Sequence, residues 1–237
     1  MAGKTTFDFD GTVALVTGAS GALGSAVVEY LQDAGATVAA TDLVPPDDEN
    51  AEPDSAVTTF YEADFTDEAA VSDVIEQVVS DHGRLDHLCN IAGTWRGGTP
   101  IDETDVDTFE FLFDVNLKTA FLASKHALAH LRESGGAIVS VSARASLEGG
   151  EGDGPYRASK AGVRLVTETI AAENLGEVRA NAVMPSVIDT PANREMMPDA
   201  DHDEWVDPGE IAAVIAFLLS DASGPTSGAA VPVYGEA

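Results

Sequence analysis

Residues 12–35 read TVALVTGASGALGSAVVEYLQDAG, and this stretch decides the fold. Its first six residues are mostly apolar or β-branched, which is typical of a buried strand. The turn TGASGALG at 17–24 follows at once, and the apolar residues behind it recur at helical spacing until Gly35. A glycine-rich turn between a strand and a helix lets backbone N–H groups approach a pyrophosphate at the helix N-terminus. The stretch therefore predicts the first strand, turn and helix of a dinucleotide-binding sheet.

The rest of the chain repeats the alternation of strand and helix. Further strands are expected at 36–42, 57–65, 84–93, 136–142, 177–185 and 228–235, and helices at 67–83, 104–133, 156–175 and 207–221. Alternating elements of this kind predict an α/β fold, a doubly wound parallel sheet with helices on both faces. Pro232 assigns the last strand to an edge, because proline cannot donate to a central ladder. With neither repeat nor linker, residues 1–237 are expected to form a single domain.

Charge narrows the possible partners. The chain carries 41 acidic against 12 basic residues, a net charge of −29. Such a surface repels nucleic acid and anionic membranes, so neither is an expected partner. The acids are dispersed along a chain with ample apolar residues, which indicates a folded protein adapted to high salt, where ions screen the repulsion.

Other features indicate a cytoplasmic protein. The N-terminal residues include no apolar signal region, and no stretch approaches the ~20 apolar residues that span a bilayer. The one cysteine, Cys89, lies in the apolar run LDHLCNIAG and is interpreted as a buried structural thiol.

A carboxylate at the end of the second strand bears on the choice of cofactor. Asp42 follows Gly24 by 18 residues, where an acid takes both ribose hydroxyls of NAD and repels the 2′-phosphate of NADP. No lysine or arginine lies between residues 5 and 83 to offset that repulsion. The sequence therefore favours NAD, although a solvated acid is the alternative in so acidic a chain.

Tyr156 and Lys160 in YRASK form the candidate catalytic pair. Four residues on a helix bring both side chains to one face. A tyrosine with an ordinary pKa near ~10 is a poor base, and lowering that pKa to ~7 takes about 4 kcal/mol of differential stabilisation. The Lys160 ammonium and a positive nicotinamide ring favour the phenolate. Tyr156 is then expected to exchange a proton with the substrate while hydride moves at the nicotinamide.

Taken together, the motifs TGASGALG, NIAG at 90–93, and YRASK, with Asp64 and Asn116 between them, resemble the short-chain dehydrogenase/reductase family over essentially the whole chain. The resemblance implies a single Rossmann-type domain with a seven-stranded parallel sheet. It implies catalytic roles for Tyr156, Lys160 and Asn116, with Ser142 as a fourth candidate. It also implies cofactor contacts from Gly18, Ser20, Gly21, Leu23, Gly24, Asp42, Asp64, Phe65, Asn90, Ala92, Gly93, Tyr156, Lys160, Pro185, Ile188 and Thr190.

Two departures from the family pattern are Ile91, where the family has a second asparagine, and Ser186, where it has glycine. Two stretches are similar to the dihydropteridine reductases, which reduce quinonoid dihydropterin. These are LCNIAGTWRGG, which makes Trp95 a substrate-binding candidate, and the run at 189–198. Asn116 departs from that branch of the family, so the substrate stays open between a small carbonyl or alcohol and a quinonoid pterin.

The serine that usually accompanies the tyrosine presents an open question. In the family it lies thirteen residues before the tyrosine, and that position here is Ala143. Ser142 is one residue early and Ser146 three late. Neighbouring strand residues face opposite sides, so Ser142 replaces it only with a bulge or a register shift. Either Ala143 faces the nicotinamide, as the dihydropteridine reductases also have alanine here, or Ser142 or Ser146 swings in.

The remaining expectations concern metal, assembly and the class of protein. His126 and His130 have metal-ligand spacing on a helix, but without an evident third ligand no metal is expected. Apolar residues on several faces of the helices at 104–133 and 156–175 predict a homodimer or homotetramer, as in the family. The competing class is a sensor that binds NAD without turnover.

Overall fold

Seven parallel strands form one sheet in the computed structural model, which describes residues 6–48, 51 and 59–236. The order across the sheet is β3-β2-β1-β4-β5-β6-β7, as expected of a doubly wound fold. The strands are β1 (Val13–Thr17), β2 (Thr37–Asp42), β3 (Thr59–Glu62), β4 (His87–Asn90), β5 (Ala137–Val141), β6 (Arg179–Pro185) and β7 (Ala230–Val233). Pro232 lies in the edge strand β7, which confirms its predicted place.

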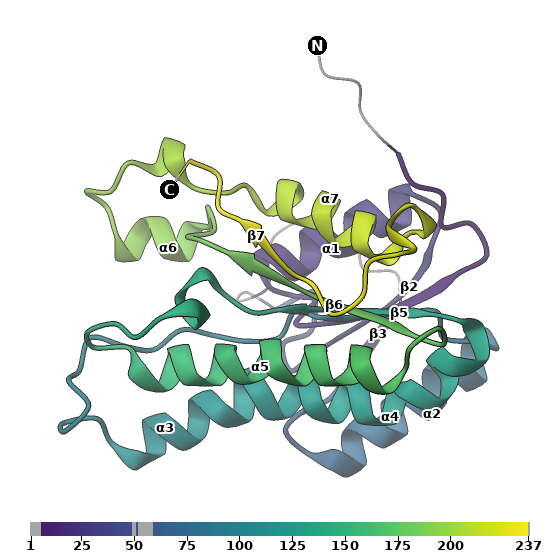
Figure 1. The fold of residues 1–237 in the computed structure, drawn as a ribbon, viewed down its shortest axis with the longest axis horizontal. Helices are drawn as coiled ribbons and strands as arrows, with labels where there is room; N and C mark the ends of the chain where they lie inside the picture. Colours follow the sequence, from purple (N-terminus) through teal and green to yellow (C-terminus); the bar gives the residue numbers. More distant parts are fainter. Residues whose placement is uncertain (1–5, 49–50, 52–58, 237) are drawn as a thin grey trace.

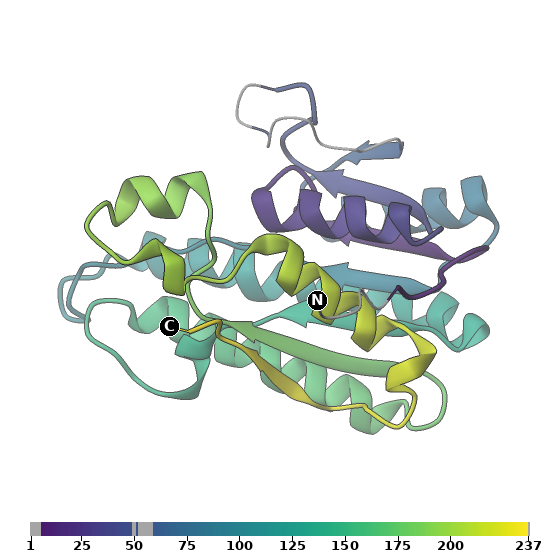
Figure 2. The ribbon, with the colours of Figure 1, turned by 90° about the horizontal axis from the view of Figure 1, so that it is seen from above.

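Helices cover both faces of the sheet (Figure 1). They are α1 (Ala22–Asp33), α2 (Glu68–His82), α3 (Val106–Phe113), α4 (Thr119–Ser134), α5 (Gly154–Glu173), α6 (Pro191–Met196) and α7 (Pro208–Leu219). Helices α1 and α7 pack side by side on one face, as the view from above also shows (Figure 2), and α2, α4 and α5 cover the other.

The core consists of two apolar layers, one on each face. Alternate residues of β1 enter opposite layers: Ala14 and Val16 join the residues under α1 and α7, whereas Val13 and Leu15 join those under α2 and α4. Because both faces are covered, all five residues of β1 are buried. This burial explains why the strand appears in the sequence as a continuous apolar run.

Local signals set the helix ends. The Asp67 carboxylate accepts hydrogen bonds from two N–H groups at the start of α2, and the Asp207 carboxylate accepts one from the Gly209 N–H at the start of α7. Gly83 and Gly135 follow α2 and α4 in the left-handed conformation, with φ values of 80° and 67°. These caps explain why the predicted helix boundaries lie close to the observed ones.

The structure corrects the long helix expected at 104–133. It consists of α3 and α4 joined by a π-helical turn, η1 (Asp114–Lys118), which contains the buried Asn116. Helix α6 was not expected, and β4 is shorter than the predicted strand at 84–93. Of the strand predicted at 57–65, residues 57–58 lie outside the described residues. Among the helices that the structure describes, none is long and apolar enough to cross a membrane.

Candidate active site

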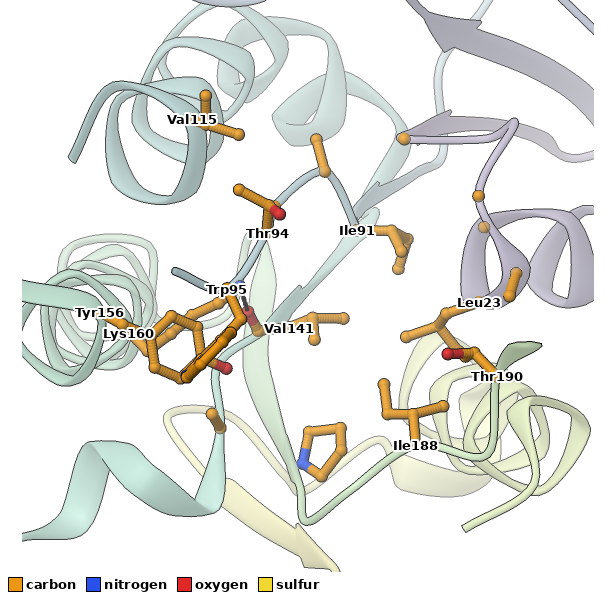
Figure 3. A pocket seen from close by; sticks show the side chains of 18 of the residues that line it. Leu23, Ile91, Thr94, Trp95, Val115, Val141, Tyr156, Lys160, Ile188 and Thr190 are labelled. Atoms are coloured by element: carbon orange, nitrogen blue, oxygen red, sulfur yellow. Dashed lines mark hydrogen bonds between the residues drawn. The ribbon is translucent and has the colours of Figure 1, made fainter. Parts of the chain in front are cut away.

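A cavity of about 1160 Å³ opens at the carboxyl ends of the strands. The glycine-rich turn and α1 form one side, where Leu23 lies, and α5 forms the other, which carries Tyr156 and Lys160 (Figure 3). Most of the residues expected to contact cofactor or substrate line it. They are Gly18, Ser20, Gly21, Leu23, Gly24, Asp42, Asp64, Phe65, Ala92, Gly93, Trp95, Ser142, Tyr156, Lys160, Pro185, Ile188 and Thr190.

The glycine-rich turn requires glycine at two positions. A Cβ on Gly18, whose φ is 67°, would lie 2.7 Å from the Ala92 backbone, and one on Gly24 would lie 2.0 Å from the Gly18 carbonyl oxygen. The turn therefore packs tightly against the segment that follows β4 and keeps the N-terminus of α1, whose N-cap is Gly21, open to the cavity. Backbone N–H groups at such a terminus fit a pyrophosphate.

Asp42 lies at the end of β2 and lines the same part of the cavity. Its carboxylate accepts hydrogen bonds from the N–H groups of Ser20 at 3.0 Å and Leu43 at 2.7 Å. These bonds fix the carboxylate beside the glycine-rich turn and leave oxygen lone pairs for ribose hydroxyls. Farther along the wall, Asp64 accepts hydrogen bonds from the backbone N–H and hydroxyl of Thr66, and the adjoining Phe65 ring is buried. These residues fit an adenosine.

Lys160 is buried and its ammonium donates to the Val141 carbonyl at 3.0 Å. Burial lowers the pKa of this lysine to about 8. Tyr156, one turn earlier on α5, is partly buried. Burial raises the pKa of Tyr156 to about 12, the Asp153 carboxylate also raises it, and Arg157 lowers it. The fall in the Tyr156 pKa that the sequence led us to expect is therefore not a property of the folded chain alone.

The three serine alternatives have different surroundings. Ala143 is buried and lines the cavity. Ser142 also lines it, but its hydroxyl donates to the Lys160 carbonyl at 2.8 Å. Ser146 lies near the Met184 sulfur, 3.9 Å away, rather than on the cavity wall. This arrangement favours the alternative in which Ala143 occupies the serine position.

Two predicted site residues lie behind the cavity wall. Asn116 in η1 is buried; its amide accepts from the Thr94 N–H at 2.8 Å and donates to the Thr94 carbonyl at 3.0 Å. A Cβ on Gly93 would meet both Asn116 Oδ1 and Lys160 Nζ, so Asn116 supports the strand end beside the lysine. The Asn90 amide donates to the hydroxyls of Ser124 on α4 and Ser140 on β5, behind the wall of the cavity.

The cavity also includes residues that the sequence reasoning did not single out. Met196 and Met197 come from the segment around α6, Asp153 is the residue before α5, and Arg157 lies in the first turn of α5. Arg157 follows Tyr156 within YRASK, so its position in that motif could have identified it as a candidate site residue.

The two histidines of α4 contact carboxylates of α2. His126 lies 3.3 Å from a Glu68 oxygen and His130 lies 3.4 Å from a Glu76 oxygen. Across the described ranges of the chain, no group of three histidine, cysteine or acidic side chains is placed to hold a metal ion.

The sheet order and this cavity define a Rossmann-type fold with a cleft at the carboxyl ends of its strands. A family model described as enoyl-(acyl carrier protein) reductase matches residues 18–235. The chain belongs to the short-chain dehydrogenase/reductase family.

Three relatives illustrate the range of this similarity. The chain is 32% identical to a 3-oxoacyl-(acyl-carrier-protein) reductase of Thermotoga maritima, over 95% of this chain and 97% of the relative. It is 31% identical to the dihydropteridine reductase of Dictyostelium discoideum, over 92% of each chain. Its structure matches the ligand-free aldohexose dehydrogenase of Thermoplasma acidophilum with a TM-score of 0.88 and 27% identity, over 97% and 95% of the two chains.

Proposed function

We propose that this protein is an NAD(H)-dependent oxidoreductase in which Tyr156 exchanges a proton with the substrate. The observation that carries the proposal is the pairing of Tyr156 with the buried Lys160 on one wall of a cavity whose opposite wall is the glycine-rich turn. A bound nicotinamide would supply or accept the hydride. Lys160, held by the Val141 carbonyl, is placed to bind a polar group beside Tyr156.

The pKa directions support Tyr156 as a proton donor in the cofactor-free site. The phenol of Tyr156 stays protonated below about 12, so near neutral pH it is a proton donor. Reduction of a carbonyl needs such a donor, whereas oxidation of an alcohol needs the phenolate as a base. The cationic form of Lys160, present below about 8, favours the phenolate that remains after the proton has left.

A small carbonyl or alcohol is the first substrate class that we propose. A quinonoid dihydropterin is the second candidate, and three observations favour it. Ala143 provides no hydroxyl where the family has serine, and Ser142 donates its own to Lys160. Trp95 lines the cavity and offers an aromatic face. The run at 189–198, similar to that of the dihydropteridine reductases, forms the wall around α6.

NADH oxidation tests this proposal. The purified protein, in multimolar KCl, is given NADH and a panel of ketones, aldehydes and quinonoid dihydropterin, and the loss of absorbance at the reduced-nicotinamide band is followed. Turnover with a ketone or aldehyde supports the first class, and turnover with the pterin alone supports the second. NADH binding without turnover across the panel would instead support the sensor.

We expect NADH to bind at least about tenfold more tightly than NADPH, or roughly 1.4 kcal/mol. The physical reason is the Asp42 carboxylate, which repels a 2′-phosphate at the end of β2. Asp42→Ala should narrow the gap, and Asp33→Ala, a change at the exposed end of α1, should leave it unchanged. Fluorescence titration of each variant with both cofactors measures this. Equal affinities in the unmodified protein would contradict the assignment of Asp42.

We also propose a homodimer or homotetramer that is stable in high salt. Apolar side chains are exposed along α3, α4 and α5, including Phe109 at 45%, Phe121 at 49% and Leu165 at 53%. Partner subunits that covered them would remove this apolar area from water. Light scattering in concentrated KCl should give the mass of two or four chains. The measured mass should fall as salt is removed, because repulsion between carboxylates grows. A monomer in concentrated KCl is the contrary result.

A further inference from the structure

Arg157, the residue after Tyr156, binds three parts of one loop. Its Nε donates to an Asp153 oxygen at 2.5 Å, and its Nη1 donates to the Glu148 carbonyl at 3.2 Å and lies 3.5 Å from the Ala145 carbonyl. The loop at 144–153 connects β5 to α5 and includes four residues of the cavity wall, Arg144, Ala145, Glu148 and Asp153. The guanidinium therefore joins the two ends of the loop to the helix that carries Tyr156.

Glycines bring this loop into close contact with the guanidinium. A Cβ on Gly150 would lie 2.2 Å from Cζ of Arg157, so the backbone there passes directly over the guanidinium plane. The run EGGEGDG at 148–154 offers little side-chain packing to hold itself, because most of its residues are glycine or exposed acid. Arg157 supplies the interactions that a stretch so rich in glycine lacks.

The loop in turn supports the segment that carries Trp95. The Gly152 carbonyl accepts hydrogen bonds from the N–H groups of Gly98 at 2.8 Å and Thr99 at 3.2 Å. A Cβ on Gly97 would lie 2.6 Å from the Trp95 ring and 3.0 Å from Cβ of Asp153. Gly97 therefore lies between the Trp95 ring and the Asp153 side chain and is close to both. The contacts from Arg157 to Trp95 are thus continuous, and all of them lie on the Tyr156 side of the cavity.

We propose that Arg157 is a positioning residue for the substrate half of the cavity. It acts by holding the loop at 144–153, and through that loop it places Trp95 beside Tyr156. The glycine-rich turn and Asp42, on the cofactor half, have no part in this network. Loss of the guanidinium should therefore loosen substrate binding and leave cofactor binding intact. The catalytic part of this inference rests on the function proposed above; the positioning of Trp95 does not.

Trp95 provides a test that needs neither cofactor nor turnover. The chain has two tryptophans, so a Trp205→Phe background leaves Trp95 as the only one. In that background, Arg157→Gln should raise the acrylamide quenching constant of Trp95 fluorescence by about 1.5-fold or more, because a ring that is now 42% exposed loses its support. The quenching constant of Arg157→Lys should lie between those of the parent and of Arg157→Gln. An ammonium can pair with Asp153 but cannot form the same planar set of hydrogen bonds.

Arg164→Gln is the matched control. Arg164 lies on the same helix and pairs with Glu168 four residues away, and its side chain is 25% exposed, against 23% for Arg157. It should leave Trp95 quenching unchanged. An unchanged quenching constant in Arg157→Gln, or an equal rise in Arg164→Gln, would overturn the proposal.

Kinetics test the functional consequence with whichever acceptor proves active. Arg157→Gln should raise the KM for that acceptor roughly tenfold, with kcat within about threefold and the NADH dissociation constant within about twofold. Arg157→Lys should recover part of the KM loss. A fall in kcat with an unchanged KM, or an equal weakening of NADH binding, would contradict a role confined to the substrate half. If no acceptor is turned over, the proposed function fails while the quenching result still decides the positioning role.

Discussion

Replacing Tyr156 by phenylalanine is expected to lower kcat roughly a hundredfold to ten-thousandfold, the usual contribution of a positioned general acid. The variant keeps the ring and loses only the hydroxyl, which on the protonated phenol is the donor facing the cavity. Single-turnover oxidation of NADH with the active acceptor measures the loss. Because the glycine-rich turn and Asp42 are untouched, NADH should still bind, and its dissociation constant should change far less than kcat. Full activity in Tyr156→Phe would remove Tyr156 from the mechanism.

Ser142→Ala is the control for that experiment. The Ser142 hydroxyl donates to the Lys160 carbonyl, so its loss disturbs a contact between the residue after β5 and α5 without removing a donor from the substrate. Turnover should stay within a few fold of the unmodified protein. A hundredfold loss, about 2.7 kcal/mol of transition-state stabilisation, would instead assign Ser142 the role that the family gives to its serine.

The parts of this protein that could be predicted from sequence are those encoded locally. The turn TGASGALG lies between a strand and a helix because three glycines permit the close approaches found at Gly18 and Gly24. Tyr156 and Lys160 share a face because they are four residues apart on a helix. The alternation of strand and helix patterns likewise predicts the parallel sheet with helices on both faces.

Features that depend on packing could not be predicted in this way. The sequence pattern continues as a helix through Asn116, whereas the structure has a π-helical turn there that directs the asparagine inward to Thr94. Asn90 matched a motif, but β4 is buried on both faces and its side chain points to Ser124 and Ser140 rather than to the cavity. The pKa of Tyr156 likewise depends on its burial in the folded chain, with further contributions from Asp153 and Arg157.

His87 is a second case in which burial decides the chemistry. The sequence shows only a polar residue in the apolar run LDHLCN. In the structure it lies on β4 with its ring perpendicular to that of Phe9, 5.3 Å between centroids, and neither ring nitrogen has a hydrogen-bond partner among the described residues. Burial lowers its pKa to about 4; Asp86 and Asp221 oppose this shift, and Arg179 and Arg84 add to it. The neutral ring is therefore the form that the fold accepts.

This depressed pKa predicts a loss of stability in mild acid. Above pH ~6.5 His87 is neutral in both the folded and the unfolded chain, so it adds no pH dependence. Between pH ~6.5 and about 4 the unfolded chain takes up a proton that the folded chain refuses, and the free energy of unfolding falls. Over that window the contribution of this one residue is about 3 kcal/mol, and below about pH 4 it stops growing.

His87→Leu separates this effect from the titration of the many carboxylates, which both proteins share. Leucine fills a similar volume and has no polar atom to bury, so the variant should be at least as stable as the parent at pH 8. Denaturant unfolding in concentrated KCl is measured at pH 8, 6, 5 and 4. As the pH falls, the free energy of unfolding of the variant should increase relative to that of the parent, by about 3 kcal/mol at the lowest pH. A difference that is constant across these pH values would mean that His87 takes up its proton as readily in the folded chain as in the unfolded one. The orphaned ring nitrogens would then have to find a partner on protonation, and the buried end of β4 would have to open to provide one.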